Sequence, residues 1–373
     1  MNTFLKRVIL VSNEVNTMMT QRKMEKERAS NIEILRIVAA LGVIALHINL
    51  KVLTEIEITN ANKLLLYIAE AFCISSVNIF LLITGFFMCK SHERSLLKPL
   101  EMVVELICIK IAFYCLALFT GHLSFNMYGV IKTLIPNNYY VILYIALYLV
   151  SVYYNKVITS VSAAQMKIML IILFVLFSVY PTIIDTAEMI SGQSLINLST
   201  ITRDGSTYGY NIVHFSLMYI IGAYFGHFHY KRVKRKYLIS ILLIVVSVIA
   251  ATSYFAHRRN GFSLGVEYSY CNPLVVISAV VIFLLFVQTD LKTSRIINRL
   301  ARASFTAYLL HPWIIKLVPF EKIMNLSPAE MVASMVVLLI CIYLICWIVH
   351  EVWNIISKPI IRKLERVNYK IFV

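Results

Sequence analysis

Long apolar stretches recur along the whole chain and are separated by short polar segments. A helix needs about 20 mostly apolar residues to cross the hydrocarbon core of a bilayer. The stretches that approach this length lie at residues 31–50, 64–88, 99–119, 139–155, 166–181, 211–229, 237–255, 271–289, 304–320 and 331–353. The pattern predicts an all-α polytopic membrane protein with ten transmembrane helices.

The composition supports this prediction and limits the domain organisation. Of the 373 residues, 60% are hydrophobic and 14% are charged, which excludes a soluble domain of ordinary composition. No internal repeat or linker divides the chain, so we expect a basic N-terminal segment at 1–30 and a single membrane domain at 31–373. The first thirty residues contain only one short apolar piece, Val8–Val11, and no removable signal peptide is expected. The longest polar connection outside the cell is predicted at Thr182–Tyr210.

The net charge of +16 is distributed very unevenly. If the helices alternate and the N-terminus is cytoplasmic, 25 of the 35 Lys and Arg residues fall on the cytoplasmic side, including the run Lys231–Lys236. The positive-inside rule then places both termini in the cytoplasm of a cell-membrane protein. Contact with membrane lipids explains the charge, and no nucleic acid partner is needed.

Two polar residues lie inside the first apolar stretch. Arg36 and His47 are eleven residues apart, which turns a helix by about 1100°, so the two side chains share one face. An arginine at membrane depth costs on the order of 2.5–3.5 kcal/mol and is usually functional. A neutral His47 imidazole is suited to act as general base for a hydroxyl that attacks a thioester, with Arg36 binding or polarising the donor. Because histidine can also act as a nucleophile, transfer through a covalent acyl-enzyme is the alternative to direct transfer.

Glu33 precedes Arg36 by three residues and is expected to pair with it or to fix its rotamer. A purely structural alternative remains for this helix. Glu33 and Arg36 would then form a buried ion pair, and His47 would bond to a backbone carbonyl.

Several segments resemble the membrane-bound acyltransferase-3 family. The first helix, RASNIEILRIVAALGVIALHI, has the family's arginine, ten residues and histidine, and the second ends in SSVNIFLLITGFFM. Further similarity covers Asn137–Ile158, Tyr208–Phe228 and the segment RASFTAYLLHPWI at Arg302–Ile314. The resemblance implies transfer of an acyl group, usually acetyl from acetyl-CoA, to a hydroxyl of a cell-surface polysaccharide or a lipid-linked glycan. It implies no bound cofactor, because the acyl-CoA is a substrate.

The resemblance also directs attention to the basic segment after the second helix. Lys90, Arg94 and Lys98 are expected to face the cytoplasm and to meet the phosphates of coenzyme A. The family often has a denser arginine cluster with an RxxR-like pattern here, whereas this chain reads KSHERSLLKP. Simple anchoring at the positive side of the membrane is the alternative.

Three further polar residues are candidates for substrate binding. Tyr308 and His311 are three apart and share a helix face, which predicts that they line the reaction cavity, and Pro312 would kink that helix. Asn78 could donate to a developing oxyanion, although an amide between helices is also common as a packing contact. For His311, the alternative to a place in the cavity is a hydrogen bond to a neighbouring helix that helps the helices to pack.

No metal site is predicted. His227 and His229 are two apart on a helix and lack a third ligand nearby, and the seven cysteines show no paired spacing. We interpret the cysteines as apolar packing residues.

Two other functions are consistent with the helices and the intramembrane charges. One is a transporter or flippase of lipid-linked sugars, in which Arg36 and His47 bind a charged head group without bond making. The chain shows no inverted repeat with paired interrupted helices, which transport would favour. The other is a non-catalytic membrane scaffold, suggested by the sparse basic cluster at Lys90–Lys98.

Overall fold

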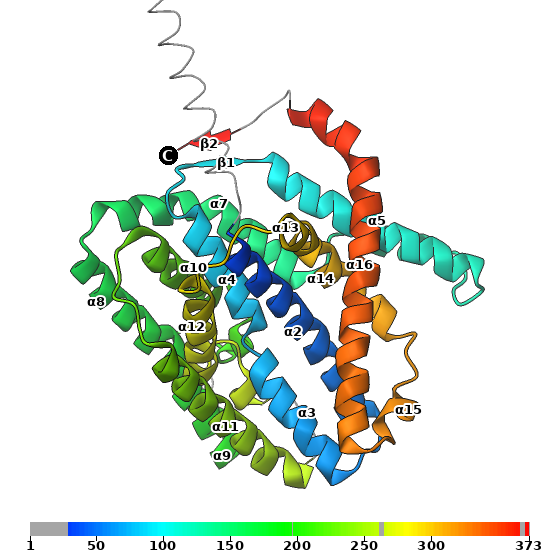
Figure 1. Cartoon of the computed structure of the whole chain (residues 1–373), viewed down its shortest axis with the longest axis horizontal. Coiled ribbons are helices and arrows are strands. Elements are labelled where there is room, and N and C mark those ends of the chain that lie inside the picture. Colours follow the sequence, from blue (N-terminus) through cyan, green and yellow to red (C-terminus); the bar gives the residue numbers. More distant parts are fainter. Residues whose placement is uncertain (1–28, 196, 261–264, 366–369, 373) are drawn as a thin grey trace, which may run out of the picture.

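The computed structural model describes residues 29–195, 197–260, 265–365 and 370–372, and helices make up most of this part of the chain (Figure 1). The first helices are α2 (Ser30–Glu55), α3 (Asn60–Cys73), α4 (Ser76–Met88), α5 (Leu97–Phe119), α6 (Met127–Leu134), α7 (Tyr139–Ser160), α8 (Ala163–Phe174) and α9 (Tyr180–Ser191). The later helices are α10 (Ile212–His227), α11 (Arg235–Asn260), α12 (Pro273–Val287), α13 (Arg295–Ala301), α14 (Ser304–Ile315), α15 (Phe320–Met324) and α16 (Pro328–Glu365). The short elements are η1 (Val175–Val179), η2 (Thr207–Gly209), η3 (Val266–Tyr268), β1 (Glu93–Ser95) and β2 (Lys370–Phe372).

The prediction of an all-α polytopic membrane protein is confirmed. Within the described residues, eight helical segments are long and apolar enough to cross a membrane. Each of the ten predicted stretches falls on a helix. Two of these helices, α10 with 16 residues and α14 with 12, are not among the eight segments. They extend about 24 and 18 Å, whereas the hydrocarbon core is roughly 30 Å thick.

The centre of the molecule is formed by α2, α4, α10 and α12, which bury a continuous apolar core. The helices α4 and α10 approach very closely because glycines face the neighbouring backbone. A Cβ on Gly85 would lie 2.0 Å from the Tyr219 carbonyl oxygen, and one on Gly222 would lie 2.2 Å from the Leu82 carbonyl oxygen. Small residues at such crossings let membrane helices approach closely and gain dispersion contacts.

One predicted boundary is wrong. The connection expected at Thr182–Tyr210 begins later, because the helix that starts at Ala163 continues through η1 into α9 and ends at Ser191. The π-turn in η1 and the position of Pro181 in the first turn of α9 explain the continuation. The wider π-turn that precedes Pro181 accommodates a residue that has no N–H to donate.

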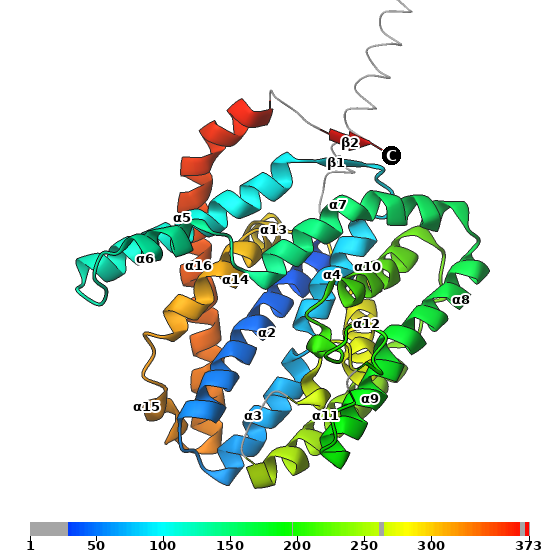
Figure 2. The ribbon, with the colours of Figure 1, turned by 180° about the vertical axis from the view of Figure 1, so that it is seen from behind.

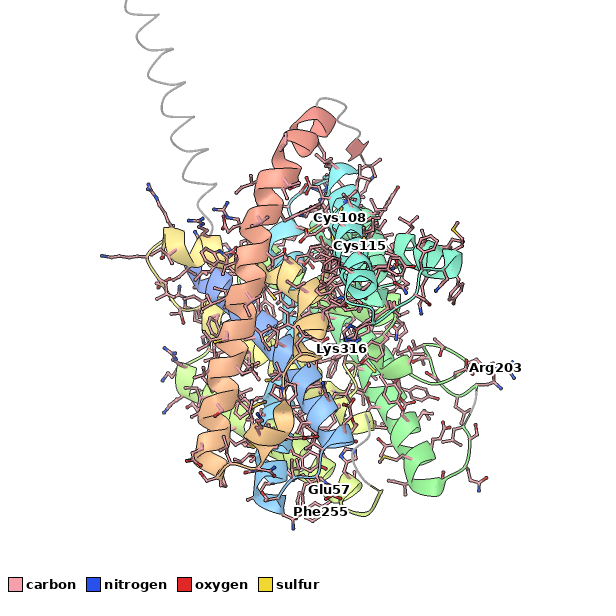
Figure 3. All side chains as sticks on the ribbon, turned by 90° about the vertical axis from the view of Figure 1, so that its right-hand side faces the viewer. Glu57, Cys108, Cys115, Arg203, Phe255 and Lys316 are labelled. Atoms are coloured by element: carbon pink, nitrogen blue, oxygen red, sulfur yellow. The ribbon has the colours of Figure 1, made fainter. Side chains whose placement is uncertain are left out.

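The loops that were predicted to be cytoplasmic gather at one end of the molecule, as does the beginning of α2 (Figure 1). The Ser30 hydroxyl donates to Asn298 at 3.0 Å, and the Val233 amide donates to the side chain of Gln288 at 3.2 Å. Strand β1 pairs with β2 at this end in antiparallel register. Glu57 and Phe255 lie at the opposite end (Figure 3).

The outer helices present apolar side chains to their surroundings. On α16, for example, Val337 is 60% and Ile348 is 56% exposed, as expected for a surface that contacts lipid. Helices α5 and α6 project to one side of the bundle, at a steep angle to α16 (Figure 2). The predicted N-terminal segment, 1–30, lies outside the described residues except for its last two.

Candidate active site

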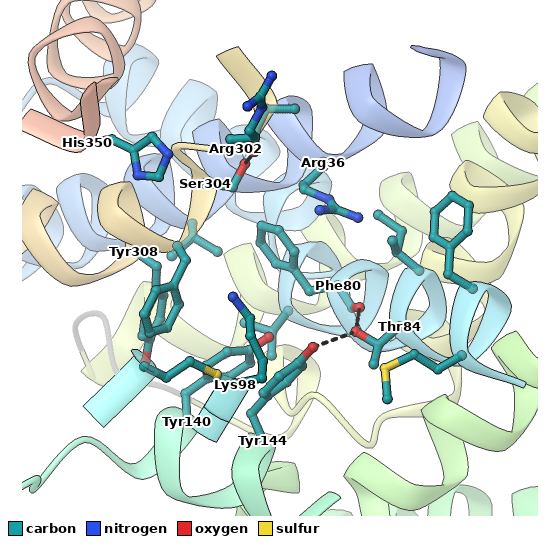
Figure 4. Close-up of a pocket in the computed structure, with 18 of the residues that line it drawn as sticks. Arg36, Phe80, Thr84, Lys98, Tyr140, Tyr144, Arg302, Ser304, Tyr308 and His350 are labelled. Carbon is teal, nitrogen blue, oxygen red and sulfur yellow. Dashed lines mark hydrogen bonds between the residues drawn. The ribbon is translucent and has the colours of Figure 1, made fainter. Parts of the chain in front are cut away.

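A cavity of about 400 Å³ opens between α2, α4, α5, α7, α14 and α16 (Figure 4). Its basic lining residues are Arg36, Lys98, Arg302 and His350. Apolar and aromatic side chains form much of the remaining wall, notably Phe80, Tyr140, Tyr144, Phe305 and Tyr308. The cavity therefore combines a cationic part with an apolar part, an arrangement suited to an anionic ligand that carries an apolar chain.

Arg36 comes from α2 and reaches this cavity with a partly exposed guanidinium (Figure 4). The predicted pairing with Glu33 is present. The Arg36 Nη2 atom lies 3.7 Å from Oε1 of Glu33, whose side chain is only 1% exposed. The carboxylate partly compensates the charge of Arg36 and restrains its position, while other donors of the fork face the cavity.

The three basic residues after the second predicted helix have different environments. Lys98 lines the cavity beside Glu101, at an Nζ–Oε2 distance of 3.5 Å. Lys90 is exposed and is not among the residues that line this cavity. Of these three residues, Lys98 is the one that lines the same cavity as Arg36.

Arg94 was predicted to meet the phosphates of coenzyme A, but in the structure its side chain is buried within the protein. It is 3% exposed, and its guanidinium makes five hydrogen bonds: to Ser151 Oγ, to the carbonyls of Ser91, Glu93 and Met88, and to the Tyr219 hydroxyl. A guanidinium has five N–H donors, so every donor is used within the protein. Arg94 fixes the turn between α4 and β1 against α7 and α10.

Helices α5, α14 and α16 form a hydrogen-bonded chain at the edge of the cavity. The Thr306 hydroxyl donates to Oε1 of the buried Glu105 at 2.5 Å and lies 2.8 Å from Nδ1 of His350. Because the single hydroxyl proton points to Glu105, Nδ1 of His350 is the donor to Thr306. Nε2 of His350, which lines the cavity, is then the atom left for other partners.

Arg299 and Arg302, near the start of α14, have different environments. Arg299 forms a paired contact with Glu351, with Nε–Oε1 at 2.9 Å and Nη2–Oε2 at 3.0 Å, and this carboxylate raises the pKa of the Arg299 guanidinium. Arg302 is exposed and lines the cavity. Of these two arginines, Arg302 is therefore the one that is available to a ligand.

His47 lies further along α2 and contacts His311 of α14. The two ring centroids are 4.6 Å apart with the rings at 77°. His47 is accessible, whereas His311 is 1% exposed. The sequence placed both residues in the reaction region, and the structure brings them into contact with each other.

The cavity ends one helical turn before His47. Its lining includes Val43, whose carbonyl oxygen lies 3.0 Å from Nδ1 of His47, but does not include His47 itself. Tyr308 also lines the cavity, and its ring centroid is 6.2 Å from that of His311. Arg36 and His47 therefore lie on the two sides of Val43, not in the single crevice that their shared face suggested.

Asn78 occupies a fully buried position between helices. Its Nδ2 donates to the Tyr270 carbonyl at 2.8 Å, and its Oδ1 lies 2.8 Å from Nε2 of His214. The Tyr308 hydroxyl donates to Asn138 Oδ1 at 3.0 Å at the cavity wall. The structure thus places Tyr308 at the cavity and gives Asn78 the packing contacts that were the alternative prediction.

Sequence reasoning missed several cavity residues, namely Arg302, His350, Tyr140 and Tyr144. The presence of His350 inside a predicted transmembrane stretch was a usable signal, since ionisable groups there are rare. Within the described residues, no group of three His, Cys, Asp or Glu side chains could hold a metal ion, and the seven cysteines are free.

Comparison with family models decides the class of the protein. Residues 30–351 match the model of the acyltransferase domain of the acyltransferase-3 type. The chain belongs to the acyltransferase-3 family. This acyltransferase is therefore a multi-pass membrane enzyme with an acyl donor and an acceptor, which sets aside the transporter and scaffold alternatives. Comparison with curated proteins and with solved structures gives no match.

Proposed function

We propose that this acyltransferase moves an acetyl group from acetyl-CoA to a hydroxyl of a cell-surface polysaccharide or a lipid-linked glycan. The observation that carries the proposal is the cavity itself. Arg36, Lys98 and Arg302 supply cations, and Phe80, Tyr140 and Tyr144 supply an apolar wall, at the end of the molecule where the basic loops gather. Coenzyme A has the same two parts, because it joins phosphates to an uncharged pantetheine arm.

The donor enters from the cytoplasm in this proposal. Its phosphates bind the cations, as paired guanidinium and ammonium donors are well suited to do. The pantetheine arm follows the aromatic wall towards Val43, and the thioester must pass this residue to reach His47. The acceptor approaches from the opposite end, where His47 is accessible.

His47 acts as the general base. The carbonyl of Val43 only accepts hydrogen bonds, so the contact at 3.0 Å fixes the proton on Nδ1 and leaves Nε2 of the neutral ring as a proton acceptor. The acceptor hydroxyl gives its proton to Nε2 as its oxygen attacks the thioester carbonyl carbon. The carbon–sulfur bond breaks, and the leaving thiolate takes a proton from the imidazolium.

Incorporation of labelled acetyl into surface polysaccharide tests the proposal. Cells that express the protein should incorporate the label, and His47→Ala should lower incorporation by at least about a hundredfold, the range for a lost general base. His229→Ala is the matched control, because His229 is exposed and outside the cavity lining. Full incorporation by His47→Ala would exclude His47 as the base, and failure of the purified protein to bind acetyl-CoA would exclude the donor.

A further inference from the structure

The histidines of α2 and α14 use the same hydrogen-bonding arrangement. Nδ1 of His47 lies 3.0 Å from the Val43 carbonyl oxygen, and Nδ1 of His311 lies 2.8 Å from the Ala307 carbonyl oxygen. Both carbonyls are four residues earlier in the same helix. Since a carbonyl has no proton to give, both rings carry a proton on Nδ1. Each ring can therefore exchange a further proton only at Nε2.

The contact between the rings limits the charge that they can hold. Their centroids are 4.6 Å apart, so two imidazolium cations would repel strongly at this distance, particularly away from bulk water. Adding one proton to the pair of rings therefore costs much less free energy than adding two. Groups that interact this strongly titrate as a unit.

The second ring nitrogen of His311 has no hydrogen-bond partner. This atom, Nε2, is buried and makes no hydrogen bond with any described protein group, although buried polar atoms usually have a partner. A histidine that served only to join helices would be expected to use this atom for a contact across the bundle. The unpartnered nitrogen beside His47 instead points to a role in proton exchange.

Among the described residues, Tyr308 of α14 is a further titratable residue in ring contact with His311. Several ionisable groups on the helices packed against α2 and α14 have partners of their own. These are Glu33 and Arg36 with each other, Glu70 with Asn49, Glu105 with Thr306, Tyr343 with Ser304, and Lys110 with the carbonyls of Lys132 and Ile135.

We propose that His311 is a positioning residue whose neutral ring, in edge contact with His47, stabilises the proton that His47 takes up, so that the two imidazoles titrate as one unit. This inference rests on the proposed acyl transfer and refines the role of its base. The acceptor hydroxyl proton moves to Nε2 of His47, and the neutral His311 ring stabilises the cation that results. The same proton then leaves with the coenzyme A sulfur, and the pair returns to its neutral state.

Replacement of His311 has an effect that depends on pH. The variants His311→Gln and His311→Phe leave His47 as a lone base, which binds its proton less readily than the pair. We expect kcat to fall roughly ten- to hundredfold, and the acid limb of the kcat profile to move to lower pH, while KM for acetyl-CoA stays within about twofold. His229→Gln is the control and should leave the profile unchanged.

A second measurement keeps the test independent of turnover. Diethyl pyrocarbonate reacts with unprotonated imidazole nitrogen, and peptide mass spectrometry of the full-length protein follows its reaction at His47 against pH. In both His311 variants the midpoint of this reaction should shift to lower pH, in parallel with kcat. A midpoint and an acid limb that coincide with those of the wild type would overturn this role of His311, whatever the change in kcat.

The two proposals fail in different ways. If His47→Ala abolishes transfer and the His311 variants keep the wild-type pH dependence, only the pairing is wrong. If His47→Ala retains full transfer, the base of the proposed function is wrong. An unfolded His311→Gln protein would be recognised by its loss of acetyl-CoA binding, and His311→Phe then carries the comparison, since it preserves a planar ring.

Discussion

Lys98 and Arg94 lie four residues apart and illustrate how position decides the role of a basic side chain. Lys98 lines the cavity, and its side chain is 56% exposed. We expect Lys98→Ala to raise KM for acetyl-CoA about five- to tenfold, because one cation for the donor phosphates is lost, with little change in kcat. Steady-state kinetics in detergent measures both constants, with the exposed Lys90→Ala as control. An unchanged KM would remove Lys98 from the donor site.

Substitution of Arg94 should instead lower the stability of the folded protein. Arg94→Lys keeps the charge but replaces a planar fork of five donors with a single ammonium, which cannot reach all of the acceptors. We expect a loss of about 2–4 kcal/mol in the free energy of unfolding, since the buried Ser151 hydroxyl and several part-buried carbonyls lose their partner. The melting temperature of the purified protein measures this. A variant that melts like the wild type would show that the hydrogen bonds of Arg94 do not matter.

Sequence reasoning located many of the site residues but not their partners. Arg36, Lys98 and Tyr308 were predicted and do line the cavity. The contact of His47 with His311 was not predicted, because periodicity places a residue on a helix face but says nothing about which distant helix packs there. Burial of Arg94 was missed for the same reason, since two of its partners, Ser151 and Tyr219, come from α7 and α10.

At the scale of helices, the close crossing of α4 and α10 is the most sensitive feature. Gly85→Ala should lower the free energy of unfolding by about 1–3 kcal/mol, because the new methyl group meets the Tyr219 backbone and the helices must move apart. Thermal unfolding in detergent measures the loss. Gly129→Ala is a suitable control, because its methyl group would meet the movable end of the Tyr114 side chain. Equal melting of the two variants would contradict the argument.

Hydropathy identified the helices well and their ends less well. Each apolar stretch forms a helix because the backbone must satisfy its own hydrogen bonds in lipid. The extension of α9 to Ser191 was missed because the residues after Pro181 are less apolar, whereas the helix continues through a π-turn that precedes this proline. The shortness of α14 was missed because residues 304–320 are apolar throughout most of their length but stop being helical at Ile315.

For the whole molecule, the positive-inside rule gives a testable orientation. Basic loops gather at the end that contains the start of α2, and Glu57 lies at the other end (Figures 1 and 3). In a cysteine-free variant, Glu57→Cys should react with a membrane-impermeant maleimide added to intact cells. Lys90→Cys, which is exposed at the other end, should react only after the cells are opened. The reverse labelling pattern would invert the orientation and the side from which the donor enters.

Val43 contributes to two features of the candidate site. Val43 lines the cavity, and its carbonyl oxygen lies 3.0 Å from Nδ1 of His47. In the proposed mechanism the thioester passes Val43 to reach His47, so a rotation of this one turn of α2 would move the cavity wall and the imidazole together. Arrival of the thioester and orientation of the base would thereby be mechanically linked, with no need for a signal between distant parts of the protein.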